Sequence, residues 1–136
     1  MKIKTPKILK NKHFNWILVV VYAGLIFYMS SKPYVIPALF TGGFFERLAN
    51  YSIKIGAAHF LEFAILSLLL FRALHVSKIK NAAVYAVIIA VIYAASDEIH
   101  QLFVPNRVCD IIDFSFDALG AIAVQTIGKI KLLFLK

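Results

Sequence analysis

Four apolar segments alternate with short polar stretches along the chain, at approximately residues 14–31, 57–74, 81–96 and 111–127. A helix needs about 20 predominantly apolar residues to cross the hydrocarbon core of a bilayer, and these segments approach that length. They lack the strict alternation of a barrel strand, and only helices or closed barrels satisfy their backbone within lipid. The pattern therefore predicts an all-α polytopic membrane protein with four transmembrane helices.

The composition supports a lipid environment. The chain of 136 residues is 61% hydrophobic and 16% charged, and its mean hydropathy is +0.80. A soluble domain of this size exposes much of its surface and could not hide so much apolar area. The first apolar segment is longer than the core of a typical signal peptide, and no small-residue cleavage site follows it, so we expect it to be a retained span.

Charge distribution predicts the orientation. The net charge of +8 could suggest nucleic acid, but the basic residues sit at the ends of apolar segments rather than in a stripe, so we expect no nucleic-acid partner. With both termini inside, 11 Lys and Arg residues fall on the inner side and 4 on the outer side. This bias predicts an N-in, C-in protein, with basic cytoplasmic ends at 1–13 and 129–136 around a membrane domain at 14–128.

The carboxylates follow the opposite distribution. All seven fall on the outer side or in the outer half of a span: Glu46, Glu62, Asp97, Glu98, Asp110, Asp113 and Asp117. Acidic residues contribute little to topology, so the insertion rule does not explain this asymmetry. Glu46 lies in the first outer loop, where Pro33, Pro37, Gly42 and Gly43 predict irregular backbone and residues 44–48 predict a short interfacial helix.

Helical spacing groups the other acids into three clusters. His59 and Glu62 are three residues apart and share one face of the second predicted helix. Asp97 and Glu98 begin a polar patch at the end of the third helix, which Gln101 continues. Asp110, Asp113 and Asp117 form one stripe on the fourth helix, and Arg107 precedes them in a turn.

Ionisable groups within a membrane span are candidates for function because inserting each costs about 2.5–3.5 kcal/mol. The candidates for acid–base chemistry are His59, Glu62, Asp97, Glu98 and Asp113. The candidates for ligand binding are Gln101, Arg107, Asp110 and Asp117. No cofactor motif is present, but carboxylates with one histidine suit a divalent cation, for which the ligands would be His59, Glu62, Asp97 and Asp113. The alternative is a structural network that closes the bundle, with Arg107 bridging two aspartates and His59 paired to an acid.

These residues resemble the VanZ-like family of bacterial membrane proteins. The matching passages occur in the family's order: FYMSS at 27–31, AHFLEF at 58–63, SDEIHQ at 96–101, PNRVCDIIDF at 105–114 and DALG at 117–120. The likeness extends from about residue 14 to residue 128. The chain departs from the family pattern at Asn106, where Gly or another small residue is usual, and at Asp117, where Asn is usual.

The resemblance implies a multi-pass protein of the bacterial inner membrane, because the family's namesake is associated with low-level resistance to the glycopeptide teicoplanin. Our leading hypothesis is an outward-facing polar site that binds or processes a lipid-linked cell-wall precursor, a glycopeptide or another amphiphilic ligand. The sequence leaves open whether the protein is an enzyme. A non-catalytic structural or binding protein and a small transporter are the alternatives.

Overall fold

The computed structural model describes residues 7–33 and 44–134 of the chain, with side-chain environments for 8–33 and 56–128. A short 3-10 helix, η1 (Lys7–Lys10), precedes α1 (Lys12–Ser30), α2 (Phe44–Val76), α3 (Ala82–Gln101) and α4 (Ile111–Phe134). Each α-helix contains a stretch long and apolar enough to cross a membrane, and the described residues include no strand. The predicted all-α class with four membrane-compatible helices is therefore confirmed.

The main difference from the predicted boundaries lies in α2. This helix begins at Phe44, so the short helix predicted at 44–48 is its first part and not a separate element. Its location at the membrane surface stays a prediction. The predicted irregular residues Pro37, Gly42 and Gly43, and the side chain of Glu46, lie outside the described part of the chain. The boundaries between the basic ends and the membrane domain, at residues 13 and 128, also stay predictions.

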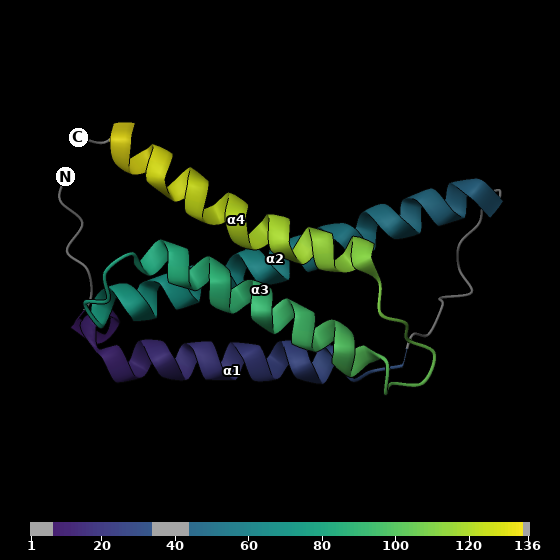
Figure 1. Ribbon diagram of the computed structural model, residues 1–136, viewed down its shortest axis with the longest axis horizontal. Helices are drawn as coiled ribbons and strands as arrows, with labels where there is room; N and C mark the ends of the chain where they lie inside the picture. Colours follow the sequence, from purple (N-terminus) through teal and green to yellow (C-terminus); the bar gives the residue numbers. More distant parts are fainter. Residues whose placement is uncertain (1–6, 34–43, 135–136) are drawn as a thin grey trace.

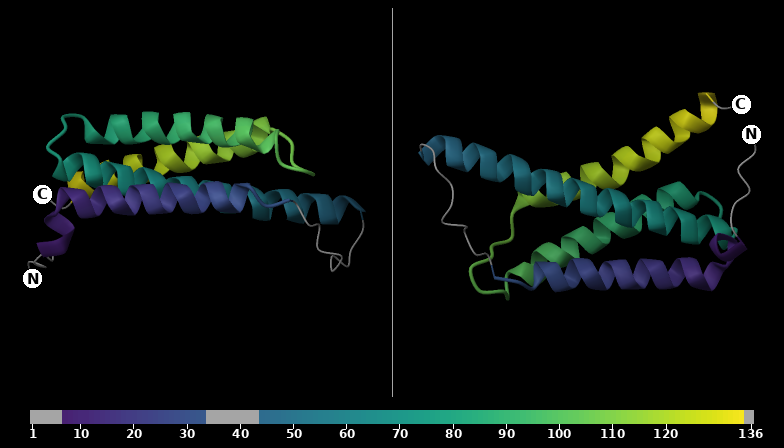
Figure 2. Two further views of the ribbon diagram at one scale, coloured as in Figure 1. Left: turned by 90° about the horizontal axis from the view of Figure 1, so that it is seen from below. Right: turned by 180° about the vertical axis from the view of Figure 1, so that it is seen from behind.

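The helix ends lie at two poles of the bundle, one rich in basic and the other in acidic residues (Figure 1). The start of α1, the α2–α3 turn and the end of α4 lie at one pole, which we call the basic end because it carries Lys12, Lys78 and Lys80. The ends of α1 and α3 and the start of α4 lie at the other pole, the acidic end, and the two views in Figure 2 show the same grouping. α2 packs against the other three helices, most extensively against α4, which crosses it.

Burial is inverted relative to a water-soluble protein. Val20 and Ile92 are 69% and 65% exposed, whereas Asn15, Ser67 and Asp117 are almost completely enclosed. In lipid, apolar side chains need no cover, while polar groups must find partners inside the bundle. The exposed apolar surface is thus the surface that a bilayer would solvate.

Small residues allow the helices to approach closely. One face of α3 is built from buried alanines at every fourth position: Ala82, Ala86, Ala90 and Ala94. Such stripes permit close packing between membrane helices, where van der Waals contact replaces the hydrophobic effect as the driving force. Towards the acidic end, the same helix buries polar side chains instead: Asp97, Glu98 and Gln101.

The tightest crossing is between α2 and α4 at Gly120. A methyl group on Gly120 would overlap the backbone carbonyl of Phe60. The two backbones can meet there only because residue 120 has no side chain. This approach brings His59, which precedes Phe60, close to Asp117, one helical turn before Gly120. Further along the same pair of helices, Gln125 Nε2 donates to the Ser67 carbonyl at 2.9 Å, and Ser67 Oγ donates to the Ala121 carbonyl at 3.0 Å.

We predict that Gly120→Ala lowers the free energy of unfolding by about 1–3 kcal/mol, because the added methyl group forces α2 and α4 apart. Thermal unfolding of the detergent-purified protein measures this effect. Gly24→Ala is the matched control, since a methyl group on Gly24 meets nothing within 4 Å. Equal melting temperatures for the two variants would contradict the close crossing.

The grouping of helix ends, together with the charge pattern, predicts which pole faces outward. Cys109 is exposed in the loop at the acidic end. It should react with a membrane-impermeant maleimide in intact cells. A Lys80→Cys variant in a Cys109→Ser background should react only after permeabilisation, because Lys80 lies at the basic end. The reverse labelling pattern would show that the N-in, C-in prediction is wrong.

Candidate functional site

The acidic end brings His59 of α2 into contact with two acids of α4. His59 Nδ1 donates to Asp117 Oδ1 at 2.9 Å, and its Nε2 lies 3.7 Å from Asp113 Oδ2. Both His59 and Asp117 are buried. Asp117 lies about 9 Å below the first residue of α4, given the 1.5 Å rise per residue. The predicted stripe on the fourth helix therefore delivers two of its three acids to the histidine.

Three further hydrogen bonds hold side chains of α3 and the start of α4 in place. Gln101 Nε2 donates to Asp97 Oδ2 at 3.0 Å, one turn along α3. Glu98 Oε2 accepts from the backbone N–H of Asp110 at 2.7 Å. The Asp110 carboxylate in turn accepts from the N–H of Ile112 at 2.8 Å. Asp110, which we predicted to bind a ligand, thus uses one carboxylate oxygen to cap the start of α4.

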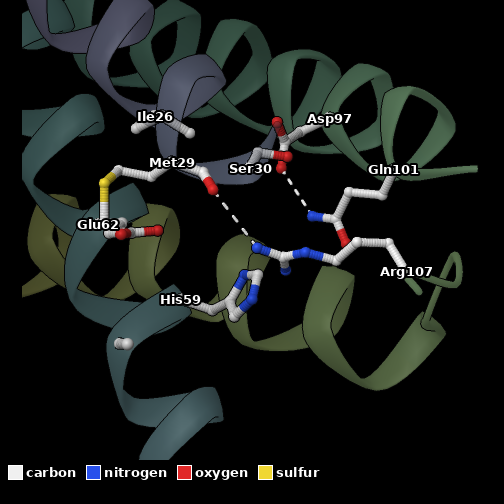
Figure 3. Close-up of a pocket in the computed structure, with 9 residues that line it drawn as sticks. Ile26, Met29, Ser30, His59, Glu62, Asp97, Gln101 and Arg107 are labelled. Carbon is white, nitrogen blue, oxygen red and sulfur yellow. Dashed lines mark hydrogen bonds between the residues drawn. The ribbon is translucent and has the colours of Figure 1, made fainter. Parts of the chain in front are cut away.

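A cavity of about 150 Å³ opens between these helices (Figure 3). Its polar lining comes from four of the predicted site residues in α2 and α3, one in the following loop, and one serine of α1: His59, Glu62, Asp97, Gln101, Arg107 and Ser30. Ile26, Met29 and Ala58 supply apolar wall. The cavity wall therefore combines polar and apolar groups, with charged side chains inside a membrane-compatible bundle.

Arg107 connects the α3–α4 loop to the end of α1. Its Nε donates to the Lys32 carbonyl at 3.1 Å and its terminal nitrogen to the Met29 carbonyl at 3.4 Å. In Figure 3 its guanidinium lies between Met29 and His59 at the cavity wall. Asn106, just before it, has a φ of 61°, in the left-handed region that Gly and Asn tolerate best. This backbone requirement accounts for an asparagine where the family pattern usually has glycine.

Sequence reasoning missed the contribution of α1. Ser30 is buried at the cavity. The hydroxyl oxygen of the neighbouring Ser31 lies 3.0 Å from His100 Nε2 and donates a hydrogen bond to the Phe27 carbonyl. His100 also packs its ring against Phe27, with 4.3 Å between centroids. The only signal in the sequence was the pair of serines ending the first apolar segment, and serines at a helix end usually cap it.

Several buried oxygens at the acidic end have no hydrogen-bond partner within the described residues: Ser30 Oγ, Asp97 Oδ1, Glu98 Oε1 and Asp117 Oδ2. Buried polar atoms are normally satisfied, so each of these calls for water, an ion or a ligand group. A metal-ligand geometry is also present in this part of the chain: one ligand atom each from His59, Glu98 and Asp117 lie within 4.8 Å of one another. This set shares only His59 with the predicted metal ligands; for Glu62, Asp97 and Asp113, that role stays a prediction.

Comparison with known proteins gives one match. The model of the family described as VanZ/LLP1 matches residues 14–132. No curated protein and no solved structure matches this chain. The matched region begins with the first span and contains all the passages on which the resemblance was based. The chain therefore belongs to the VanZ/LLP1 family.

Proposed function

We propose that this membrane protein binds one polar group of an amphiphilic cell-envelope molecule in the cavity at its acidic end, while the apolar part of that molecule stays in lipid. The observation that carries this proposal is the composition of the cavity wall. Ile26 and Met29 of α1 line the same space of about 150 Å³ as Glu62 and Asp97. Ligand sites typically combine apolar walls with a few placed polar groups.

The carboxylates of the cavity supply the attraction for a cationic or hydrogen-bonding group. Asp97 is 4% exposed, and its Oδ1 has no partner among the described residues. Glu62 is half-buried and lines the same cavity. Oxygens in this setting form charge-assisted bonds, which are stronger than bonds between neutral groups. An ammonium, hydroxyl or amide group of the ligand would satisfy them.

Arg107 gives the same wall a positive group. It lines the cavity while donating to two carbonyls of the α1 terminus. A guanidinium can also contact a phosphate or carboxylate. A ligand that carries both an anionic and a donor group therefore fits the wall better than a purely cationic one.

These properties favour a lipid-linked cell-wall precursor or a lipoglycopeptide such as teicoplanin, to which the family name also points. Both combine an apolar chain with a polar group rich in hydrogen-bond donors. In this proposal the protein resides in the bacterial inner membrane. Its acidic end faces outward, where such molecules would be present. Reduced teicoplanin susceptibility of the host would be the cellular consequence.

We predict that Glu62→Gln and Asp97→Asn each weaken binding of labelled teicoplanin to the nanodisc-embedded protein by about tenfold, since hydrogen bonds to charged groups contribute about 1.5–3 kcal/mol. The same variants should confer less teicoplanin protection on a susceptible host. Lys80→Gln, which removes an exposed charge at the opposite end, is the control. Membrane levels of all variants are compared by immunoblot.

Wild-type affinity and protection in both acid variants, at equal membrane levels, would contradict the proposal. Loss of the protein from the membrane would instead favour the alternative in which the polar cluster is a structural network. If Glu62→Gln and Asp97→Asn both fail to accumulate in the membrane while Lys80→Gln accumulates normally, the polar cluster serves mainly to close the bundle.

A catalytic version of the same site has one specific observation in its favour. The bond between His59 Nδ1 and Asp117 Oδ1 orients the imidazole and fixes which ring nitrogen carries the proton. Nε2 is then the nitrogen that could exchange a proton with a bound group. In this alternative, His59 catalyses hydrolysis or group transfer. The acids that would assist it are Glu62, Asp97, Glu98 or Asp113.

The catalytic version predicts a covalent change in the ligand. Purified protein incubated with a lipid-linked disaccharide-peptide precursor should yield a product of altered mass, and His59→Gln should abolish that product while leaving precursor binding within about threefold, because the amide retains a hydrogen-bonding group. Mass spectrometry of the extracted lipid makes the measurement. An unaltered precursor with the wild-type protein would leave binding as the function of the site.

A further inference from the structure

We propose that His59, Glu98 and Asp117 form a binding site for one divalent transition-metal ion, Mn²⁺ or Zn²⁺. Such a metal site would not depend on whether the cavity binds an amphiphile. One ligand atom from each residue lies within 4.8 Å of the other two. Ligands at about 2.0–2.3 Å from a common tetrahedral ion lie about 3.3–3.8 Å apart. Side-chain shifts of up to about 1 Å would therefore close the site.

The three side chains are already close together. His59 Nδ1 lies 2.9 Å from Asp117 Oδ1, and Glu98 uses Oε2 to accept from the backbone of Asp110. An ion between His59 and Asp117 would replace the proton on Nδ1, because Nε2 points away from the carboxylate that Nδ1 contacts. The ligand atoms would then be Nδ1 of His59, a carboxylate oxygen of Asp117 and Oε1 of Glu98.

Two buried oxygens of these residues call independently for a partner. Glu98 is 3% exposed and Asp117 is fully buried. Glu98 Oε1 and Asp117 Oδ2 have no hydrogen-bond partner among the described residues. A protonated His59 would neutralise one carboxylate but would leave both oxygens unsatisfied. An ion shared by the two acids would satisfy both.

Charge also favours an ion over a purely internal network. The acids that lie inside the membrane-compatible stretches at this end are Glu62, Asp97, Glu98, Asp113 and Asp117. Among the residues with described side chains, the cations near them are Arg107 and, when protonated, His59. Several buried carboxylates with so few cations are costly within a membrane unless a further positive charge is present. A divalent ion supplies two.

The ligand set indicates the class of metal. One imidazole nitrogen with two carboxylate oxygens suits Mn²⁺ or Zn²⁺, whereas Mg²⁺ and Ca²⁺ prefer oxygen ligands alone. Three protein ligands leave coordination positions for water or a ligand group. Because His59 also lines the cavity, an ion held there would lie at its wall.

The test measures binding of Mn²⁺ and of Zn²⁺ separately to the full-length protein, purified in detergent and stripped with a chelator. We expect one ion per chain. Glu98→Gln and Asp117→Asn should each weaken binding by at least about tenfold, the effect seen even when a partner outside the coordination sphere is lost. Asp117→Asn can still accept the bond from His59, so the helix crossing should survive; circular dichroism checks this.

Asp97→Asn is the matched comparison, because it removes a buried acid of the same end that is not one of the three ligands proposed here. Its affinity should stay within about threefold of wild type, since a charge that does not touch the ion attracts it only through space. An equal loss in Asp97→Asn would overturn the proposal, because attraction by the acidic cluster as a whole would explain the binding. Unchanged affinity in Glu98→Gln and Asp117→Asn would also overturn it, as would no binding to wild type at about 100 µM of either metal.

A second measurement needs no acid variant to fold. Pulsed electron paramagnetic resonance of Mn²⁺ bound to the wild-type protein should show coupling to one histidine nitrogen. For Zn²⁺, X-ray absorption should show a mixed nitrogen and oxygen shell. Oxygen ligands alone would exclude His59 and overturn the site.

Discussion

The bond between His59 and Asp117 joins α2 to α4 inside a stretch that lipid would otherwise surround, and the rest of the acidic end depends on it. A carboxylate at that depth is tolerated only when protein encloses it and a partner approaches it. Gly120 makes the approach possible, because any side chain there would overlap the backbone of Phe60. The absence of a side chain at one position thus allows a charged contact one turn away.

The crossing of α2 and α4 also determines how α3 and its loop are placed. α3 packs its alanine face within the bundle and then presents Asp97, Glu98 and Gln101 towards the same space. The Glu98 carboxylate accepts from the backbone of Asp110, where α4 begins. α3 and α4 are therefore linked at the acidic end through a bond that also orients an acid. The cavity and the proposed metal site share His59, so the two proposals concern adjacent sides of one cluster.

In a protein of this kind, substitutions of buried polar residues are expected to affect both stability and function. Its helices expose many large apolar side chains, and its interior contains a limited set of buried polar groups. Removing an acid from such an interior can affect packing and ligand binding together. For this reason isosteric changes such as Glu62→Gln and Asp117→Asn are more informative than truncation to alanine.

The sequence alone determined the class of the protein, its four apolar helices and the family, because hydrophobic length and motif order are local properties of the chain. It also placed Asp113 and Asp117 on one helical face. It could not decide which acids meet, because that depends on the α2–α4 crossing at Gly120 and on the loop around Arg107. Only the tertiary structure shows that His59 pairs with Asp117 and that Asp110 caps the start of α4. It also shows that Ser30 lines the cavity and that Glu98 lies close to the histidine. These contacts join residues on different helices, and spacing along one helix says nothing about distances between two.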